Sequence, residues 1–225
     1  MNKISVAFVL ALVGSLCGCA TTGYQHASET SSAISGTKLL AVKVQQSIDA
    51  TVTNLQSLTS QETIDLRQPY ERLSAVVNTL DAQVANLTDQ AQVIKARGNA
   101  YAKDWQQELG SYQSSAIRLR SAERLNQVIE DFRKVSQQFE ATGQALRLLL
   151  ANLEDVRRYL KTDLTATGVA SIQEQLGDVT KQAVSGQQTL QSLLDELNRV
   201  GRELSPVTQV AEQPSPSTEQ PNPSK

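Results

Sequence analysis

Few side chains in this chain could carry covalent or metal chemistry. Its 225 residues include two cysteines, Cys17 and Cys19, and one histidine, His26. A structural zinc site needs four ligands, so these three residues are too few for one, and they are too few for a disulfide framework. His26 has no Cys or His partner in its segment, and we expect it to be a solvated residue.

Other catalytic signatures are also missing from the sequence. It contains no Gly-rich phosphate loop, no nucleophile elbow and no paired metal-ligand motif. Glu154 and Asp155 stand beside Arg157 and Arg158, a spacing that favours ion pairs along one helix over acid–base catalysis. Lys and Arg number 21 against 23 Asp and Glu, so no basic excess indicates nucleic acid. We therefore expect no enzyme activity, no cofactor, no metal and no nucleic-acid partner.

The two cysteines stand at the end of a targeting signal. A short cationic start is followed by an apolar run from Ile4 to Leu16, which is too short to cross a bilayer. The run ends in Leu16-Cys17-Gly18-Cys19, which resembles the bacterial lipobox and implies a signal peptide over residues 1–18 and acylation of Cys19. The alternative is an ordinary secretory signal with two incidental cysteines.

Cleavage before Cys19 would change the mature chain. Lys3 leaves, so 20 basic residues face 23 acidic ones and the net charge becomes −3. Cys17 leaves too, so no free thiol remains once Cys19 carries its acyl chains, which anchor it to the membrane. In lipoproteins of this kind an Asp after the cysteine signals retention in the inner membrane. Ala20 therefore implies an outer-membrane lipoprotein that faces the periplasm of the bacterial cell envelope.

The segments that flank the body have the composition of unstructured chain. Residues 19–33 are rich in Ser, Thr, Ala and Gly, and we expect a flexible tether whose helix begins between Ala27 and Ile34. Residues 205–225 hold five prolines and predict a disordered tail. Such a tail could instead bind a partner or span peptidoglycan.

The body, residues 34–204, is predicted to be helical and all-α. It contains one proline, Pro69, and is dominated by Gln, Leu, Ala, Glu and Arg, which favour helices. Apolar residues recur at alternating steps of three and four, as in coiled coils. Four blocks carry this spacing: Ile34, Thr37, Ala41, Val44, Ile48, Thr51, Leu55, Leu58; then Tyr70, Leu73, Val77, Leu80, Val84, Leu87, Ala91, Ile94, Gly98, Tyr101, Trp105; then Leu125, Val128, Phe132, Val135, Phe139, Thr142, Leu146, Leu149, Leu153, Val156, Leu160; then Val169, Ile172, Leu176, Val179, Ala183, Gly186, Leu190, Leu193, Leu197, Val200, Leu204.

Turn and cap residues separate these blocks. Residues 59–62 match a capping box, Pro69 suits a first helical turn, and Gly168 could end a turn with a positive φ. Residues 110–115 form a weaker break, which could be a turn or a stutter in one long helix. We predict an elongated antiparallel coiled coil, or up-down bundle, of about four long helices. Whether the bundle closes within one chain or as a homo-oligomer stays open.

Antiparallel pairing can be tested by residue numbers. In an antiparallel pair of helices, the numbers of opposing residues add to a constant. The apolar positions of the third and fourth blocks lie opposite one another at a sum of 329, and those of the second and third blocks at a sum of 230. The second pairing sets Gly98 opposite Phe132 and Ala91 opposite Phe139, as an interdigitated core requires. Gly186 predicts a thin core layer, either a hinge or a close helix approach. The tether, the turn at 105–125 and the tail should lie at one end, near the membrane.

Part of the chain resembles a known family. The residues that carry the resemblance lie between Asp104 and Leu204: Asp104-Trp105, Glu108-Leu109, Tyr112, Leu119-Arg120-Ser121, Glu123-Arg124-Leu125, residues 159–166, Ile172 and Leu176. They resemble uncharacterised bacterial proteins catalogued as domain of unknown function 2959. Members tend to have Asn where this chain has Asp163 and Thr165. The resemblance implies a coiled-coil envelope protein and supplies no activity.

The basic residues Arg118, Arg120 and Arg124 fall at the membrane-proximal end of the expected bundle. They could contact anionic lipid head groups. The alternative, which the sequence favours, is a solvated surface beside Glu108 and Glu123.

For the whole chain we expect a scaffold, adaptor or spacer held by acylated Cys19 that binds unknown envelope proteins. The alternative function is a binding or chaperone-like module with a groove between helices.

Overall fold

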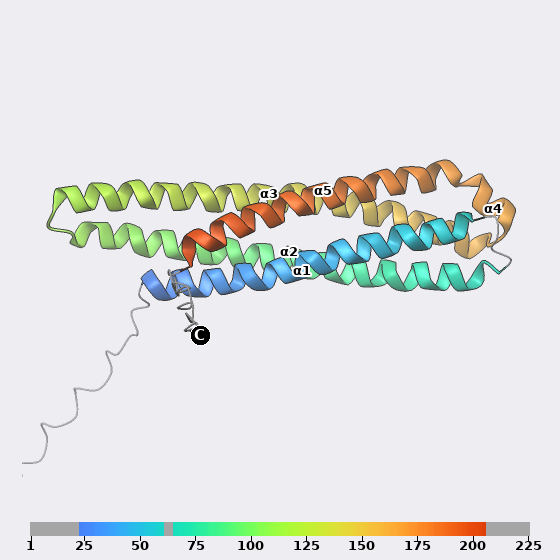
Figure 1. Cartoon of the computed structure of the whole chain (residues 1–225), viewed down its shortest axis with the longest axis horizontal. Helices are drawn as coiled ribbons and strands as arrows, with labels where there is room; N and C mark the ends of the chain where they lie inside the picture. The colour runs from blue at the N-terminus through green and yellow to red at the C-terminus, as the bar shows by residue number, and fades with distance from the viewer. Residues whose placement is uncertain (1–22, 61–64, 206–225) are drawn as a thin grey trace, which may run out of the picture.

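All regular secondary structure in the described part of the chain is helical. A computed structural model describes residues 23–60 and 65–205. Four long helices, α1 (Gly23–Thr59), α2 (Arg67–Glu108), α3 (Ser115–Thr162) and α5 (Gln173–Leu204), alternate in direction along a rod (Figure 1). A 3-10 turn, η1 (Leu109–Ser111), follows α2, and a short helix, α4 (Ala166–Ser171), precedes α5. The expected all-α, elongated, antiparallel bundle is confirmed.

The bundle closes within one chain. Helix α1 packs against α2 and α5, and α3 packs against the same two helices. The longest helix, α3, has 48 residues and is therefore about 72 Å long at 1.5 Å per residue. Within residues 23–60 and 65–205, no helix has the length and apolarity needed to cross a bilayer.

The apolar positions of the four blocks form the core of the rod. We call the row of these positions along one helix its seam. Every seam position of the first, third and fourth blocks is buried. In α2 the seam is buried from Leu73 to Leu87 and at Ile94 and Gly98. Four α2 positions are half-buried and pack against the core: Tyr70, Ala91, Tyr101 and Trp105. The spacing of three and four therefore identified the buried face of each long helix.

The predicted pairing of a small residue with a large one is found at Gly98. A methyl group placed on Gly98 would lie 2.7 Å from the ring of Phe132, so only glycine fits there. Gly186 is also a place of close approach, because a methyl group there would lie 3.3 Å from Leu146 and 3.6 Å from Ile48. The core at Gly186 is filled by these side chains.

The break between the second and third blocks is a turn. Helix α2 ends at Glu108, η1 follows, and Tyr112 is extended before α3 begins. The Ser114 hydroxyl caps α3 by accepting a hydrogen bond from the Ile117 backbone N–H. The alternative of one continuous helix through residues 105–125 is therefore wrong.

The fourth block differs from one continuous helix. Its first turns form α4, and the chain bends at Ile172 before α5 begins. The Thr165 hydroxyl caps α4 by accepting a hydrogen bond from Gly168 N–H at 2.9 Å. Gly168 is helical and has no positive φ; its lack of a side chain instead admits the Asp163 carbonyl, 2.5 Å from where a Cβ would lie.

The prediction of a flexible tether is wrong for residues 23–33, which belong to α1. Thr30 is buried, and it continues the seam four residues before Ile34. Contacts with distant residues hold this segment: Glu29 pairs with Arg97 at 3.0 Å, and Ser31 bonds Ser205 at 3.0 Å.

Several other predictions fall outside the described residues. The signal peptide, Cys19 and residues 19–22 precede α1, and residues 206–225 follow Ser205. The expected capping box is described only at Thr59 and Ser60, the end of α1, and helix α2 begins at Arg67. Pro69 lies in the first turn of α2, as predicted.

Candidate functional site: the α2–α3 tip

The hairpin of α2 and α3 extends beyond the other two helices at one end of the rod (Figure 1). Helix α5 ends at Leu204, and near this end Glu203 pairs with Arg124 of α3 at 3.5 Å. The first ten residues of α3, 115–124, therefore project beyond α5. At 1.5 Å per residue the projection is about 15 Å long. We call residues 105–124 the overhang and residues 110–122 its tip.

An aromatic cluster forms the base of the overhang. Trp105 donates a hydrogen bond from its indole N–H to the Ser121 hydroxyl at 2.8 Å, which ties α2 to α3. The Trp105 and Tyr101 rings lie 5.4 Å apart, and the His26 ring lies 6.3 Å from that of Tyr101. Burial raises the pKa of Tyr101, and the nearby Arg124 opposes this rise.

His26 belongs to this cluster, so the prediction of a solvated histidine is wrong. Its side chain is 18% exposed, and Nε2 lies 2.8 Å from Oδ2 of Asp104. The sequence signal that α1 extends as far as His26 is Thr30, which stands four residues before Ile34 and continues the spacing of the first block. His26 and Asp104 are 78 positions apart in the chain, so their pairing could not be recognised before the helices were paired.

The three expected basic residues do not share one environment. Arg118 donates to the Tyr112 carbonyl at 2.9 Å and stays exposed, and Arg120 is exposed. Arg124 is half-buried and paired with Glu203. The structure therefore leaves two of the three arginines, Arg118 and Arg120, on the solvent surface of the tip.

A buried ion pair holds α5 to α3 just behind the overhang. Arg199 lies 2.7 Å from Asp131, whose side chain is 6% exposed, and it also contacts Glu196 at 2.6 Å and Glu203 at 2.8 Å. Hydrogen bonds to Glu196 and to Asp131 raise the pKa of Arg199 above its ordinary value. Sequence reasoning missed this network, because Asp131 stands next to the seam residue Phe132 and was not recognised as a buried position. The network holds α5 at a fixed position along α3.

The tip also carries exposed apolar side chains that sequence reasoning missed. Ile117 is 56% exposed and Leu119 is 61% exposed. Because these residues lie outside the heptad blocks, the spacing gave no reason to single them out.

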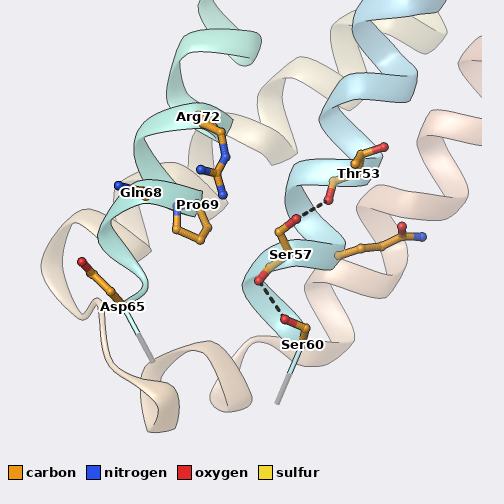
Figure 2. A pocket seen from close by; sticks show the side chains of 8 residues that line it. Thr53, Ser57, Ser60, Asp65, Gln68, Pro69 and Arg72 are labelled. Carbon is orange, nitrogen blue, oxygen red and sulfur yellow. Dashed lines mark hydrogen bonds between the residues drawn. The ribbon is translucent and has the colours of Figure 1, made fainter. Parts of the chain in front are cut away.

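The opposite end of the rod has a polar hollow, shown in Figure 2, between the end of α1 and the start of α2. Its walls include Thr53, Ser57, Asp65, Gln68 and Arg72. Ser57 and Ser60 use their hydroxyls to bond carbonyls of the last turns of α1. Residues 61–64, which connect the two walls, lie outside the described residues, so we assign no ligand to this hollow.

Elsewhere the described helices carry the expected ion pairs. Arg157 contacts Glu154 at 2.7 Å, and Arg158 contacts Asp155 at 3.1 Å. Among residues 23–60 and 65–205, no three His, Cys, Asp or Glu side chains are grouped so that they could hold a metal ion.

Comparison with known proteins gives one result. A family described as a protein of unknown function, DUF2959, matches residues 35–203. The match is wider than the residues that carried the resemblance in the sequence: it covers α2 and α3 completely and most of α1 and α5. No curated protein and no solved structure matches the chain.

Proposed function

Because the chain belongs to this family, whose description assigns no activity, we propose a function from the geometry of the rod. We propose that the chain is a lipid-anchored protein of the periplasm, held by acylated Cys19, that acts as a scaffold, adaptor or spacer through protein contacts. In this proposal it is an outer-membrane lipoprotein and has no catalytic role.

One observation carries the proposal: the seams of α1, α2, α3 and α5 supply buried side chains along the length of the rod. A core of this kind gives a stiff body whose working surfaces are its sides and ends. The alternative, a binding or chaperone-like module, needs a groove between helices. Such a groove could open at Gly186, where the sequence predicts a thin core layer, but Leu146 and Ile48 fill the core there, so the alternative gains no support.

The positions of the ends favour a spacer. Helix α1 begins on the side of the rod where α5 ends, and the α1–α2 and α3–α4 turns lie at the opposite end (Figure 1). An anchor at Cys19 would place these two turns about 70 Å away along α3, at 1.5 Å per residue. Protein contacts at those turns would then be made far from the membrane.

Site-directed photo-crosslinking in cells tests this proposal. A crosslinking amino acid is placed at Gln68 or Lys161, which are exposed near the far turns, and at Leu148 in the middle of α3 as a matched exposed control. We expect discrete crosslinked partners from the far-end positions and few from Leu148. An equal, diffuse set of products from all three positions would contradict the spacer reading.

The anchor needs its own measurement. Mass analysis of the mature N-terminal peptide should show acyl chains on Cys19, and Cys19→Ser should release the protein from the membrane fraction. A mature chain with an unmodified Cys19 would refute the anchored part of the proposal.

A further inference from the structure

The tip of the overhang differs in composition from the rest of the rod. Residues 110–122 contain no Asp or Glu, and they include Arg118 and Arg120. Beside these arginines, Ile117 and Leu119 expose more than half of their surface. Arginines next to exposed aliphatic side chains suit the boundary between lipid head groups and acyl chains.

Ile117 is exposed because α5 is too short to cover it. Ile117, Arg124 and Asp131 are spaced seven residues apart, so they lie on one side of α3. Along this side, Arg124 contacts Glu203 and Asp131 contacts Arg199, both from α5. Helix α5 ends at Leu204, before it reaches the level of Ile117. The apolar side chain is therefore left on a face that is covered elsewhere.

The length of chain between Cys19, the proposed anchor, and the start of α1 indicates which surface could cover this face. Only residues 20–22 separate Cys19 from Gly23, the first residue of α1. Four residue steps span at most about 14 Å of extended chain. His26, in the first turn of α1, lies 2.8 Å from Asp104, next to the start of the overhang. The tip therefore projects beyond the start of α1 by less than the about 15 Å by which it projects beyond α5. With an acyl anchor at Cys19, the bilayer surface would therefore be within reach of the tip.

We propose that the tip is a second membrane contact, in which Arg118 and Arg120 bind anionic phospholipid head groups and the neighbouring Ile117 and Leu119, on other sides of α3, contact the apolar part of the interface. The inference rests on the proposed acylation of Cys19. Arg124 has no part in it, because it lies behind the tip, where it contacts Glu203 of α5 at 3.5 Å. The rod would then be fixed in orientation by two attachments, the acyl chains and the tip.

Spin labelling of the acylated protein tests the contact. Once Cys17 is removed and Cys19 is acylated, Leu119→Cys supplies the only free thiol for a nitroxide. The matched control is Leu148→Cys, since Leu148 is 56% exposed on the same helix. Each labelled protein is reconstituted into vesicles containing phosphatidylglycerol and a lipid with a chelated nickel head group. We expect nickel lipid to relax the label at position 119 and to leave the label at position 148 unaffected.

Charge variants then test the role of the arginines. Arg118→Gln with Arg120→Gln should lower the ratio of docked to undocked tip about 25-fold in anionic vesicles, at about 5-fold per arginine near a charged surface. The matched pair Arg147→Gln with Arg158→Gln, on exposed α3 arginines of the rod body, should leave the ratio unchanged. Equal responses to the two pairs would overturn the role of Arg118 and Arg120.

Two further outcomes would overturn the membrane contact itself. The label at position 119 could respond to nickel lipid no more than the label at 148. It could also be shielded from both nickel lipid and a water-soluble nickel chelate, which would show that protein covers the tip. Mass analysis of Cys19 in the same sample separates these results from a failure of the anchor, because the tip contact is judged only in acylated protein.

Discussion

The contact between Gly98 and Phe132 allows a quantitative test of the register of α2 and α3. Gly98 lies inside α2, where glycine is normally unfavourable, and a methyl group at this position would lie 2.7 Å from the Phe132 ring. Gly98→Ala therefore has two opposing effects on stability: it improves the helix propensity of α2, and it makes the new methyl group overlap with the Phe132 ring. Gly177 offers a matched control, because it lies inside α5 and a methyl group there would meet nothing within 4 Å.

The two effects can be estimated separately. In an open helix interior, Gly→Ala stabilises a protein by about 1 kcal/mol. Forcing extra volume into a packed core costs about 1–3 kcal/mol. We therefore expect Gly177→Ala to raise the free energy of unfolding by about 1 kcal/mol. Gly98→Ala should leave it unchanged or lower it by up to about 2 kcal/mol, the difference of the two terms.

A double-mutant cycle isolates the overlap. Phe132→Leu removes the ring that the new methyl group would strike, so Gly98→Ala should be better tolerated in that background by about 1–2 kcal/mol. The assay is denaturant unfolding followed by circular dichroism, on the mature chain with Cys19→Ser so that no acyl group is attached.

Either of two results would refute this reasoning. Gly98→Ala could stabilise the protein as much as Gly177→Ala, which would mean that the ring and the glycine are not in contact. The cycle could also show no coupling between positions 98 and 132. In both cases the pairing of α2 with α3 would be incorrect.

Two other predictions concern charged and titrating groups near the overhang. Asp131→Ala should destabilise the protein by about 1–3 kcal/mol, because Arg199 loses its buried partner, whereas Asp155→Ala, from an exposed pair, should cost no more than about 0.5 kcal/mol in the same unfolding assay. Burial raises the pKa of Tyr101 above its ordinary 10.0, so the unfolded chain loses this proton first and stability should fall as pH rises above about 10. Tyr101→Phe should remove that part of the pH dependence, and an unchanged slope of unfolding free energy against pH would contradict the assignment.

The seam of the rod could be read from the sequence because it repeats. An apolar side chain every three or four residues specifies one face of a helix, and burial of that face is what holds α1, α2, α3 and α5 together. The match of Gly98 with Phe132 followed from counting residues in opposite directions from one turn. These inferences need only the spacing of side chains along each helix.

The features that stayed hidden depend on pairs that are far apart in the chain. Residues 23–33 look like unstructured chain by composition, yet Arg97 and Ser205 hold them in α1. Asp131 looks like a surface residue until α5 brings Arg199 to it. The overhang arises from the unequal lengths of helices, and helix ends are the least well specified features of a repeating sequence.

The unequal helix lengths also divide the rod into parts of different mechanical resistance. Behind Arg124 each long helix packs against two neighbours, whereas the end of the overhang is a hairpin of α2 and α3 that projects beyond the other two helices (Figure 1). A two-helix segment buries less of its surface, so its backbone opens at a lower free energy than that of the four-helix body. Strain applied at that end would be absorbed by bending or fraying of the overhang, and the four-helix body behind it would keep its shape.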